Sequence, residues 1–335
     1  MKSNIIILWT AAALLLAGCA KTPSTDYGQL AQMEFDAWVS VNKQPGWQQT
    51  GLGSWITEIT DDASRTAVGS VDEYPYMSVS YTVSTLAGTV NSTTDRATAQ
   101  KIGTFVQKNY YGPQILYRGS NGIYAGLEEV VNTLHEGGRA RVIIPGWLLT
   151  NDRFSTKEKY LANMTESVSA LVYDFTIEEL IADIDAWDLA KVKNALPAGA
   201  DSLTTGVYYV CDTPSDDPTE FVSGDKVYVN YICRRLLDGY AVDTNIADTA
   251  KVYGLYNSSS SYSPLLINWA SSASELTMTT SESSMIGGFS AAIFNMHLHE
   301  KGRAYMISAQ AYKANGSGSA IPGYCPLIYD LEVVK

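Results

Sequence analysis

Hydrophobic residues follow two different periods along the chain. A period near 3.6 residues marks two segments, at Leu30, Met33, Ala37, Trp38 and Val41 in one, and at Leu180, Ile181, Ile184, Trp187 and Val192 in the other. This spacing places apolar side chains along one face of a helix. Pro45-Gly46 and Pro197 then end the two segments. We predict an amphipathic helix over 30–41 and a linker helix within 178–200.

A period of two residues marks most of the remaining chain. Met77, Val79, Tyr81 and Val83 alternate with polar residues, which is typical of a half-buried strand. Further strands are predicted at 51–59, 139–144, 171–177, 206–211, 226–235, 303–308 and 327–334, and short helices at 127–134 and 289–297. Residues 91–122 are predicted to be a loop, whereas the insertion at 250–284 is apolar enough to be ordered. Mostly antiparallel strands with one short helix indicate an α+β fold.

Several motifs occur twice in the same order, which is the signature of an internal repeat. Leu134-His-Glu-Gly-Gly-Arg-Ala140 returns as Leu298-His-Glu-Lys-Gly-Arg-Ala304, and Asp36-Ala-Trp38 returns as Asp185-Ala-Trp187. Leu171-Val-Tyr-Asp-Phe175 has its counterpart in Leu327-Ile-Tyr-Asp-Leu331. One domain has therefore been duplicated. The predicted divisions are a leader over 1–18, a tether and helix over 19–50, a first domain over 51–177, the linker helix over 178–200 and a second domain over 201–335.

The N-terminus has the form of a secretory leader. Lys2 precedes an apolar run from Ile5 to Ala17, which is too short to span a bilayer. The run ends in Leu16-Ala-Gly-Cys19, which resembles the bacterial lipobox, so that lipidation at Cys19 and membrane anchoring are implied. An uncleaved anchor with an incidental cysteine is the alternative. No acidic cluster follows Cys19, and in similar Bacteroidetes lipoproteins this favours an outer-membrane location that faces the periplasm.

The net charge excludes one class of partner, and the cysteine count limits the possible disulfides. The net charge of −12 argues against a nucleic-acid partner, because phosphate contacts need a basic face. Beyond Cys19 the chain holds Cys211, Cys233 and Cys325, an odd number, so at least one thiol is unpaired unless another chain supplies a partner. Cys233 continues the inward alternation of its strand and is predicted to be a buried thiol. The 22 Tyr and 7 Trp residues fill a β-rich core or, alternatively, form a binding surface.

The second domain contains an ordered series of motifs. They are Val227-Tyr-Val-Asn-Tyr231, Leu237-Asp-Gly-Tyr-Ala-Val-Asp243-Thr244, Met285-Ile-Gly-Gly-Phe289, Lys301-Gly-Arg-Ala304, Ala311-Tyr312, Ile321-Pro322 and Leu327-Ile-Tyr-Asp-Leu-Glu332. Over residues 201–335 this series resembles the FKBP-type peptidyl-prolyl cis-trans isomerase family, whose fold is an antiparallel sheet curled around a short helix. The resemblance implies two FKBP-like domains joined by an amphipathic helix.

The resemblance also implies a catalytic pocket in the second domain. Its catalytic positions fall on Tyr231, Asp243, Ile286, Phe289, Tyr312 and Tyr329, and its substrate-binding positions on Val242 and Met285. Val242 stands where the family usually has Phe, Phe289 where it often has Trp, and Lys313 where a Gly usually follows the pocket Tyr. From the residues alone, Tyr231 and Tyr329 could equally belong to a core, and Asp243 could cap local backbone.

The first domain resembles the family more faintly. Tyr81 and Tyr173 match pocket positions, but Asn91 replaces the Asp, Tyr124 the Ile, Leu127 the Trp, and Thr150 the pocket Tyr. We interpret this domain as a degenerate and inactive copy.

The chemistry implied by the family needs few reactive groups. Rotation about an X–Pro bond is slow because amide resonance must be broken, with a barrier of roughly 20 kcal/mol. A catalyst need only bind the twisted amide better than the planar forms. Neither a nucleophile nor a cofactor is required. His297-Leu-His299 raises a metal site as an alternative, but two residues at this spacing on a helix point in different directions.

Two functions from different classes remain open. The chain is either an isomerase that assists the folding of proline-containing exported proteins, or a non-catalytic lipoprotein whose domains are binding modules. Such modules would either hold unfolded chains or dock onto an outer-membrane protein assembly. The retained Asp243, Ile286 and Tyr312 favour the isomerase, whereas the substitutions at 242 and 289 favour the binding protein. A glycan-binding lipoprotein rests only on the abundant Tyr and Trp residues.

Overall fold

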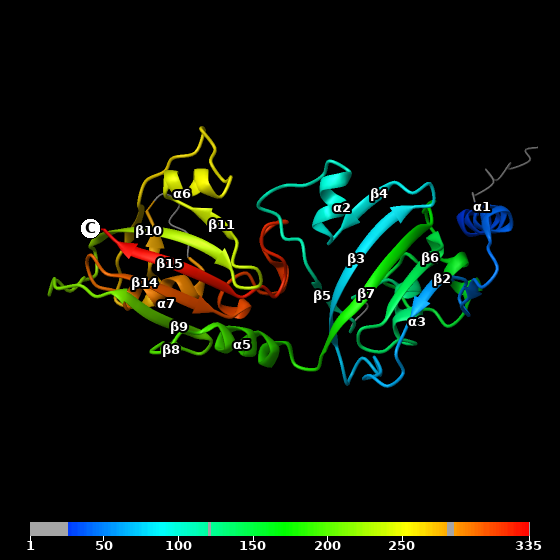
Figure 1. Cartoon of the computed structure of the whole chain (residues 1–335), viewed down its shortest axis with the longest axis horizontal. Coiled ribbons are helices and arrows are strands. Elements are labelled where there is room, and N and C mark those ends of the chain that lie inside the picture. Colours follow the sequence, from blue (N-terminus) through cyan, green and yellow to red (C-terminus); the bar gives the residue numbers. More distant parts are fainter. Residues whose placement is uncertain (1–25, 120–121, 280–284, 335) are drawn as a thin grey trace, which may run out of the picture.

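The molecule contains two β-sheets, and a short helix packs against each of them (Figure 1). The computed structural model describes residues 26–119, 122–279 and 285–334. The strands of the first sheet are β1 (Gln48–Gln49), β2 (Trp55–Thr60), β3 (Tyr76–Thr85), β4 (Val90–Thr93), β5 (Gln114–Tyr117), β6 (Arg139–Ile144) and β7 (Leu171–Ile181). Those of the second are β8 (Asp201–Thr204), β9 (Val207–Thr213), β10 (Lys226–Arg235), β11 (Ala241–Thr244), β12 (Leu265–Asn268), β13 (Thr277–Met278), β14 (Lys301–Met306) and β15 (Leu327–Val333).

The helices are short apart from those that precede each domain. They are α1 (Tyr27–Asn42), α2 (Arg96–Lys101), α3 (Ala125–Val131), α4 (Lys157–Ala162), α5 (Ile184–Ala195), α6 (Ala247–Val252) and α7 (Gly287–Phe294). Single 3-10 turns are η1 (Gly146–Leu148), η2 (Ala273–Glu275), η3 (Ser308–Gln310) and η4 (Lys313–Asn315). Among the described residues, no helix is long and apolar enough to cross a membrane.

The two sheets share one topology. The order β2-β6-β7-β3 in the first sheet corresponds to β9-β14-β15-β10 in the second, and the pairings along both paths are antiparallel. In each domain a short helix, α3 or α7, packs against the sheet and closes a hydrophobic core. The predicted α+β fold with two similar domains is confirmed.

The register of the sheets shows how the two copies align. Gly137 and His299 both adopt a positive φ and donate their N–H to the closing strand, at Ile177 and Val333 respectively. His135 therefore corresponds in space to His297, and not to His299 as the repeated heptapeptide suggests. The motif is shared, but it lies two residues out of step between the domains. A left-handed conformation at a non-glycine residue such as His299 is strained.

Helix α1 buries a different face from the one predicted. Gly28, Ala31, Phe35 and Val39 are buried, while Leu30 is 38% exposed, Met33 63% and Val41 82%. A Cβ added at Gly28 would lie 2.2 Å from the Leu161 carbonyl oxygen, so the small residue is what lets α1 approach α4. The prediction chose the larger apolar residues and was wrong.

Two segment predictions also need correction. Residues 91–122 were expected to be a loop, yet they contain most of β4 and all of α2 and β5. The linker helix begins only at Ile184, because β7 continues through Ile181 as it pairs with β3. The apolar residues near 180 thus belong to a strand. The apolar residues at the end of β7 are followed at once by those of the helix, so the sequence pattern shows no clear boundary between the two elements.

The domains touch through a loop from each. The Tyr110 N–H donates to the Ser319 carbonyl at 2.9 Å. The guanidinium of Arg235, whose residue is only 1% exposed, donates to the Lys108 carbonyl at 2.8 Å and to the Ala320 carbonyl at 2.5 Å. Arg235 is also paired with Asp238 at 2.8 Å and lies over the Tyr110 ring. One buried cation therefore binds the loops of both domains.

Candidate functional site

A cavity of about 290 Å³ opens on one face of the second sheet. Its lining residues are Tyr231, Asp243, Leu265, Met278, Met285, Ile286, Phe289, Tyr312 and Tyr329. Strand β10 supplies Tyr231, β11 supplies Asp243 and β15 supplies Tyr329, while Met285, Ile286 and Phe289 come from the start of α7. All six predicted catalytic residues thus meet in one place, together with the predicted substrate-binding Met285. Their catalytic role stays a prediction.

Aromatic rings form the floor of this cavity. The ring centroids of Phe289 and Tyr329 lie 5.1 Å apart, and Tyr231 lies 6.0 Å from each of them. Edge-on and tilted contacts of this kind suit the quadrupoles of the rings. Phe289 and Tyr329 are buried, so the same rings serve the core and the cavity.

One carboxylate enters the apolar cavity. The Tyr231 hydroxyl donates a hydrogen bond to Asp243 Oδ2 at 2.8 Å. Burial raises the pKa of Tyr231, and the negative charge of Asp243 raises that pKa further. Burial likewise raises the pKa values of Tyr312 and Tyr329. The three hydroxyls therefore stay protonated near neutral pH and can act as hydrogen-bond donors.

Val242 does not line the cavity. Val242 is buried in the core cluster that also contains Phe289 and Tyr329, whereas the exposed Asp243 lines the cavity. The predicted substrate-binding role of Val242 stays a prediction.

Tyr312 stands at the base of the loop that reaches the first domain. Lys313 follows it with a φ of 55°, in the left-handed region that favours the glycine of the family. The Tyr324 N–H donates to the Lys313 carbonyl at 2.8 Å and closes the loop. Since the loop tip is held by Tyr110 and Arg235, contacts with the first domain help to set the position of Tyr312.

Two lining residues were missed by the sequence analysis. Leu265 begins β12 and Met278 ends β13, and both strands lie within the insertion at 250–284. The apolar run Leu265-Leu-Ile267 was a signal for order there. It did not show which face would meet the cavity, because that depends on the pairing of β12 with β10.

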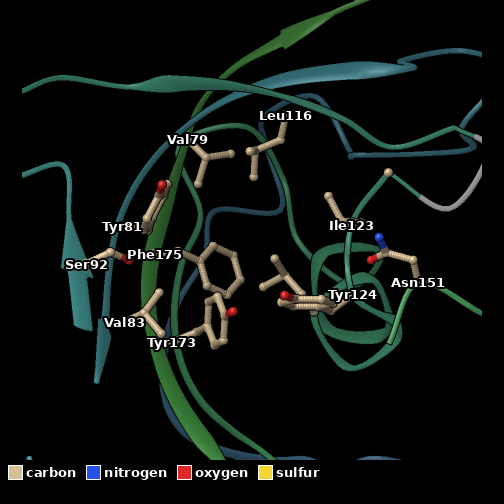
Figure 2. Close-up of a pocket in the computed structure, with 12 residues that line it drawn as sticks. Val79, Tyr81, Val83, Ser92, Leu116, Ile123, Tyr124, Asn151, Tyr173 and Phe175 are labelled. Carbon is tan, nitrogen blue, oxygen red and sulfur yellow. The ribbon is translucent and has the colours of Figure 1, made fainter. Parts of the chain in front are cut away.

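The first domain has a matching cavity of about 300 Å³ (Figure 2). Tyr81, Tyr173 and Phe175 project from strands β3 and β7, and Tyr124 approaches from the start of α3. The rings of Tyr124 and Tyr173 meet edge to face at 6.5 Å. The cavity lies at the same place in the sheet as that of the second domain, as the family resemblance implied.

The sheet register corrects one correspondence between the two cavities. Ser92 lies opposite Val83, as Asp243 lies opposite Cys233 in the second sheet. Ser92, and not Asn91, therefore occupies the position of the carboxylate. The hydrogen bonds nearby agree, since the N–H groups of Tyr81 and Tyr231 donate to Thr94 and Asn245 respectively.

Other predicted features of the chain have the following outcomes. Cys233 is buried as predicted, and burial raises its pKa to about 12, so its thiol is unreactive. Cys211, Cys233 and Cys325 are all free. No group of three or more His, Cys, Asp or Glu residues gathers into a metal-like cluster within the described part of the chain. The lipidation position Cys19 lies outside the described residues.

Comparison with known proteins agrees with this geometry. Residues 217–334 match the family model of the FKBP-type peptidyl-prolyl cis-trans isomerase. That range contains the complete lining of the second cavity. The search of curated proteins gave no match.

Several solved structures of this family are similar to the chain. A peptidyl-prolyl cis-trans isomerase from Pseudomonas syringae pv. tomato is 25% identical, with a TM-score of 0.31, over 45% of this chain and 89% of that one. The three FKBP domains of wheat FKBP73 match 84% of this chain and 94% of theirs, at 14% identity and a TM-score of 0.30. The N-terminal domain of FKBP42 from Arabidopsis thaliana matches 42% and 92%, at 13% identity and a TM-score of 0.30.

Proposed function

We propose that the second domain is a peptidyl-prolyl cis-trans isomerase that acts on exported proteins. The family match over residues 217–334 supports isomerase chemistry in general. The single observation that carries the proposal is the Tyr231–Asp243 hydrogen bond inside an aromatic cavity of that domain. A buried ring floor with one oriented polar group suits the binding of a proline ring and its amide.

The cavity would act by binding the twisted amide more tightly than the planar forms. When the amide twists, resonance is lost and its carbonyl becomes less polar, so it loses less on leaving water than a planar amide does. The rings of Phe289 and Tyr329 offer such an apolar surface. Preference for the transition state lowers the barrier without any covalent step.

Polar groups at the cavity orient the substrate. Asp243 fixes the hydroxyl of Tyr231 and acts as an acceptor in place, not as a base. The Tyr312 hydroxyl is a donor at the loop side of the cavity, and the family resemblance assigns the backbone N–H of Ile286 to a substrate carbonyl. Since the tyrosine pKa values are all raised, we expect isomerisation to be independent of pH between about 6 and 9.

The cellular setting belongs to the same proposal. The sequence around Cys19 supports a lipid anchor, and the absence of an acidic cluster after it favours the periplasmic side of the outer membrane. Proline-containing polypeptides that cross or enter the envelope would be the substrates.

Proline-limited refolding of a model protein tests the activity. The soluble chain that begins at Ala20 is compared with its Asp243→Asn, Tyr312→Phe double variant, which keeps the cavity shape. We expect the wild-type chain to accelerate refolding and the double variant to lose at least about tenfold in kcat/KM, which equals about 1.4 kcal/mol of transition-state stabilisation. Tyr228→Phe, on the opposite face of β10, is the matched control because Tyr228 does not line the cavity.

The same assay separates the isomerase from a second candidate. If the folded wild-type chain does not accelerate refolding, the protein is better described as a non-catalytic lipoprotein that binds an outer-membrane assembly. The neutral cavity of the first domain favours that alternative, because it shows that one copy of the fold has lost the carboxylate.

A further inference from the structure

The first domain keeps a cavity for which isomerisation provides no use. Its volume of about 300 Å³ is at the small end of the roughly 300–1,000 Å³ typical of ligand pockets. The cavity in the second domain has nearly the same volume, about 290 Å³.

The lining of the cavity is largely apolar and carries no charge, with Ser92, Asn151 and the tyrosine hydroxyls as its polar groups. Val79, Val83, Leu116, Ile123 and Leu127 supply hydrocarbon surface, and no Lys, Arg, His, Asp or Glu is among the described lining residues. Figure 2 shows Val79, Val83, Leu116 and Ile123 around one shared hollow with the rings of Tyr173 and Phe175. A charged group would lose its hydration here without a partner, whereas a hydrocarbon group gains from leaving water.

A second, more polar hollow lies beside the cavity, between the domains. Tyr81 and Ser92 line both spaces. The second hollow has a volume of about 400 Å³, and Gly318, Ser319 and Pro322 of the second domain also line it. Its other walls are rich in hydroxyl and amide groups, from Thr93, Thr94, Thr104 and Asn109.

Strand β4 offers backbone groups along the same hollow. It pairs with β3 and lies at the end of the first sheet, and its residues from Asn91 to Thr93 line the hollow. The outer edge of such a strand can pair with an added extended chain. Peptide N–H and C=O groups need partners when they leave water, and this edge with its neighbouring hydroxyls supplies them.

We propose that the first domain is a second peptide-binding site, which holds an extended polypeptide without isomerising it. One uncharged apolar side chain of the polypeptide enters the cavity between β3, β7 and α3, and the adjoining backbone lies in the hollow between the domains. Binding needs no carboxylate, which explains how Ser92 can stand where the second domain has Asp243. The inference does not depend on isomerase activity, because it concerns a different domain and binding alone.

A sugar fits these surfaces less well than a polypeptide. The walls of the cavity include five aliphatic side chains, against which sugar hydroxyl groups would lose hydrogen bonds to water. An aliphatic side chain makes no hydrogen bonds to water, so it loses none on entering the cavity. The polar hollow alone could accept a sugar, so an oligosaccharide is used as a competitor in the test.

Photo-crosslinking on the soluble full chain tests the proposal. The probe is an N-acetylated, amidated hexapeptide, Ala-Ala-photoleucine-Ala-Ala-Gly, and mass spectrometry locates the adducts. We expect adducts on β3, β7 and α3 of the first domain. Leu116→Trp, which fills the cavity from its wall, and Ser92→Arg, which places a long charged side chain in its lining, should each reduce these adducts at least fivefold. The Thr89→Arg variant adds the same charge beside β4 at a residue that does not line the cavity, and it should leave them unchanged.

Three results would overturn the proposal. The first is an absence of adducts in the first domain, whether or not the second domain is labelled. The second is labelling there that survives both Leu116→Trp and Ser92→Arg in chains whose circular dichroism spectra match the wild type. The third is loss of labelling when maltohexaose is added in excess, which would assign the site to a sugar. Refolding catalysis is measured separately, so failure of the isomerase proposal would leave these outcomes distinct.

Discussion

In the second domain, the Tyr231 hydroxyl donates a hydrogen bond to the carboxylate of Asp243. The equivalent Tyr81 of the first domain shares its cavity with the neutral hydroxyl of Ser92 instead. The cavities are otherwise nearly equal in volume. Their walls are residues that the core also needs, such as Val79 at 2% exposure and Phe289 at 4%. Folding therefore preserves the hollow in both copies. It does not preserve Asp243, an exposed residue whose loss leaves the core intact.

The aromatic bulk of the two cavities is also placed differently. Phe289 projects from helix α7, where the first domain has Leu127 on α3. On the closing strand the arrangement reverses, since Phe175 occupies the position of Leu331. One ring has in effect moved from the helix to the strand, which keeps the volume filled while it changes the surface presented to a ligand.

Truncation of the helix residues should give the largest effect on this comparison. Phe289→Ala removes a buried ring that contacts Tyr231 and Tyr329, and we expect it to lower the unfolding free energy of the second domain by about 3–5 kcal/mol. Leu127→Ala should cost the first domain about 2–3 kcal/mol. Hydrogen exchange followed in urea reads each domain separately. Equal losses in both domains from one substitution would show that they unfold as a single unit.

Arg235→Ala should break the contact between the domains. It removes a cation that donates to the Lys108 and Ala320 carbonyls, and we expect a loss of about 2–3 kcal/mol in the second domain. Arg118, which is also buried but bonds within the first domain, provides the matched comparison as Arg118→Ala. Small-angle scattering should report a larger radius of gyration for Arg235→Ala only. An unchanged radius would show that the remaining contacts hold the domains together.

The helices that precede the domains differ in one buried group. Helix α1 meets η1 through the rings of Phe35 and Trp147, whereas α5 meets η3 through Asp188, which accepts the Ser308 N–H at 2.5 Å. The Asp188 residue is 1% exposed, and its Oδ1 atom has no hydrogen-bond partner among the described residues. Burial raises the pKa of Asp188 to about 6.

This buried acid makes the stability of the second domain depend on pH. Since the pKa is higher in the folded state, the folded protein binds the extra proton, and this contribution is lost as pH rises from about 4 to 6. We expect the loss to be about 2 kcal/mol. Urea unfolding at pH 4.5 and 7.5 measures it, and Asp188→Asn, which keeps the acceptor for Ser308, should remove it. If the variant keeps the same difference, another group is responsible.

Exchange of the two polar residues should have the smallest energetic effect and addresses the comparison most directly. Asp243→Ser gives the second cavity the chemistry of the first, and we expect kcat/KM for proline isomerisation to fall about tenfold, or about 1.4 kcal/mol. Ser92→Asp gives the first cavity a carboxylate near Tyr81. In a chain that already carries Asp243→Ser, it should restore a few per cent of the activity. Full activity in Asp243→Ser would mean that the carboxylate does not orient the substrate.

The resemblance to the FKBP-type family brought most residues of the second cavity together, because they lie in short motifs that keep the order of the family. Tyr231 and Tyr329 sit on strands whose alternation fixes their face, and Met285 to Phe289 open a helix. Leu265 and Met278 could not be placed, because they reach the cavity only through the pairing of β12 and β13 with distant strands. Val242 does not line the cavity although it precedes Asp243, because its side chain is buried in the core.

The errors outside the cavity have physical causes as well. The face of α1 was chosen by residue size, whereas the helix packs through Gly28 and Ala31, whose small side chains allow close approach to α4. The repeated heptapeptide was aligned by letter identity, but the turn with positive φ sets the register, at Gly137 in one copy and His299 in the other. The pattern of inward and outward residues could not reveal the shift either. Moving a strand by two residues keeps every side chain on the same face of the sheet.

Buried Arg235 has a practical consequence for anyone who dissects the chain. A fragment cut near residue 199 would keep the arginine but lose the Lys108 carbonyl and the Tyr110 ring that shield it. Water would then reach the guanidinium, and the loop from Tyr312 to Tyr324 would be held at its tip by its own domain alone. Low isomerase activity in such a fragment would reflect the loss of these contacts and not the activity of the second domain in the full chain. The activity of the second cavity is therefore best measured in a chain that contains both domains.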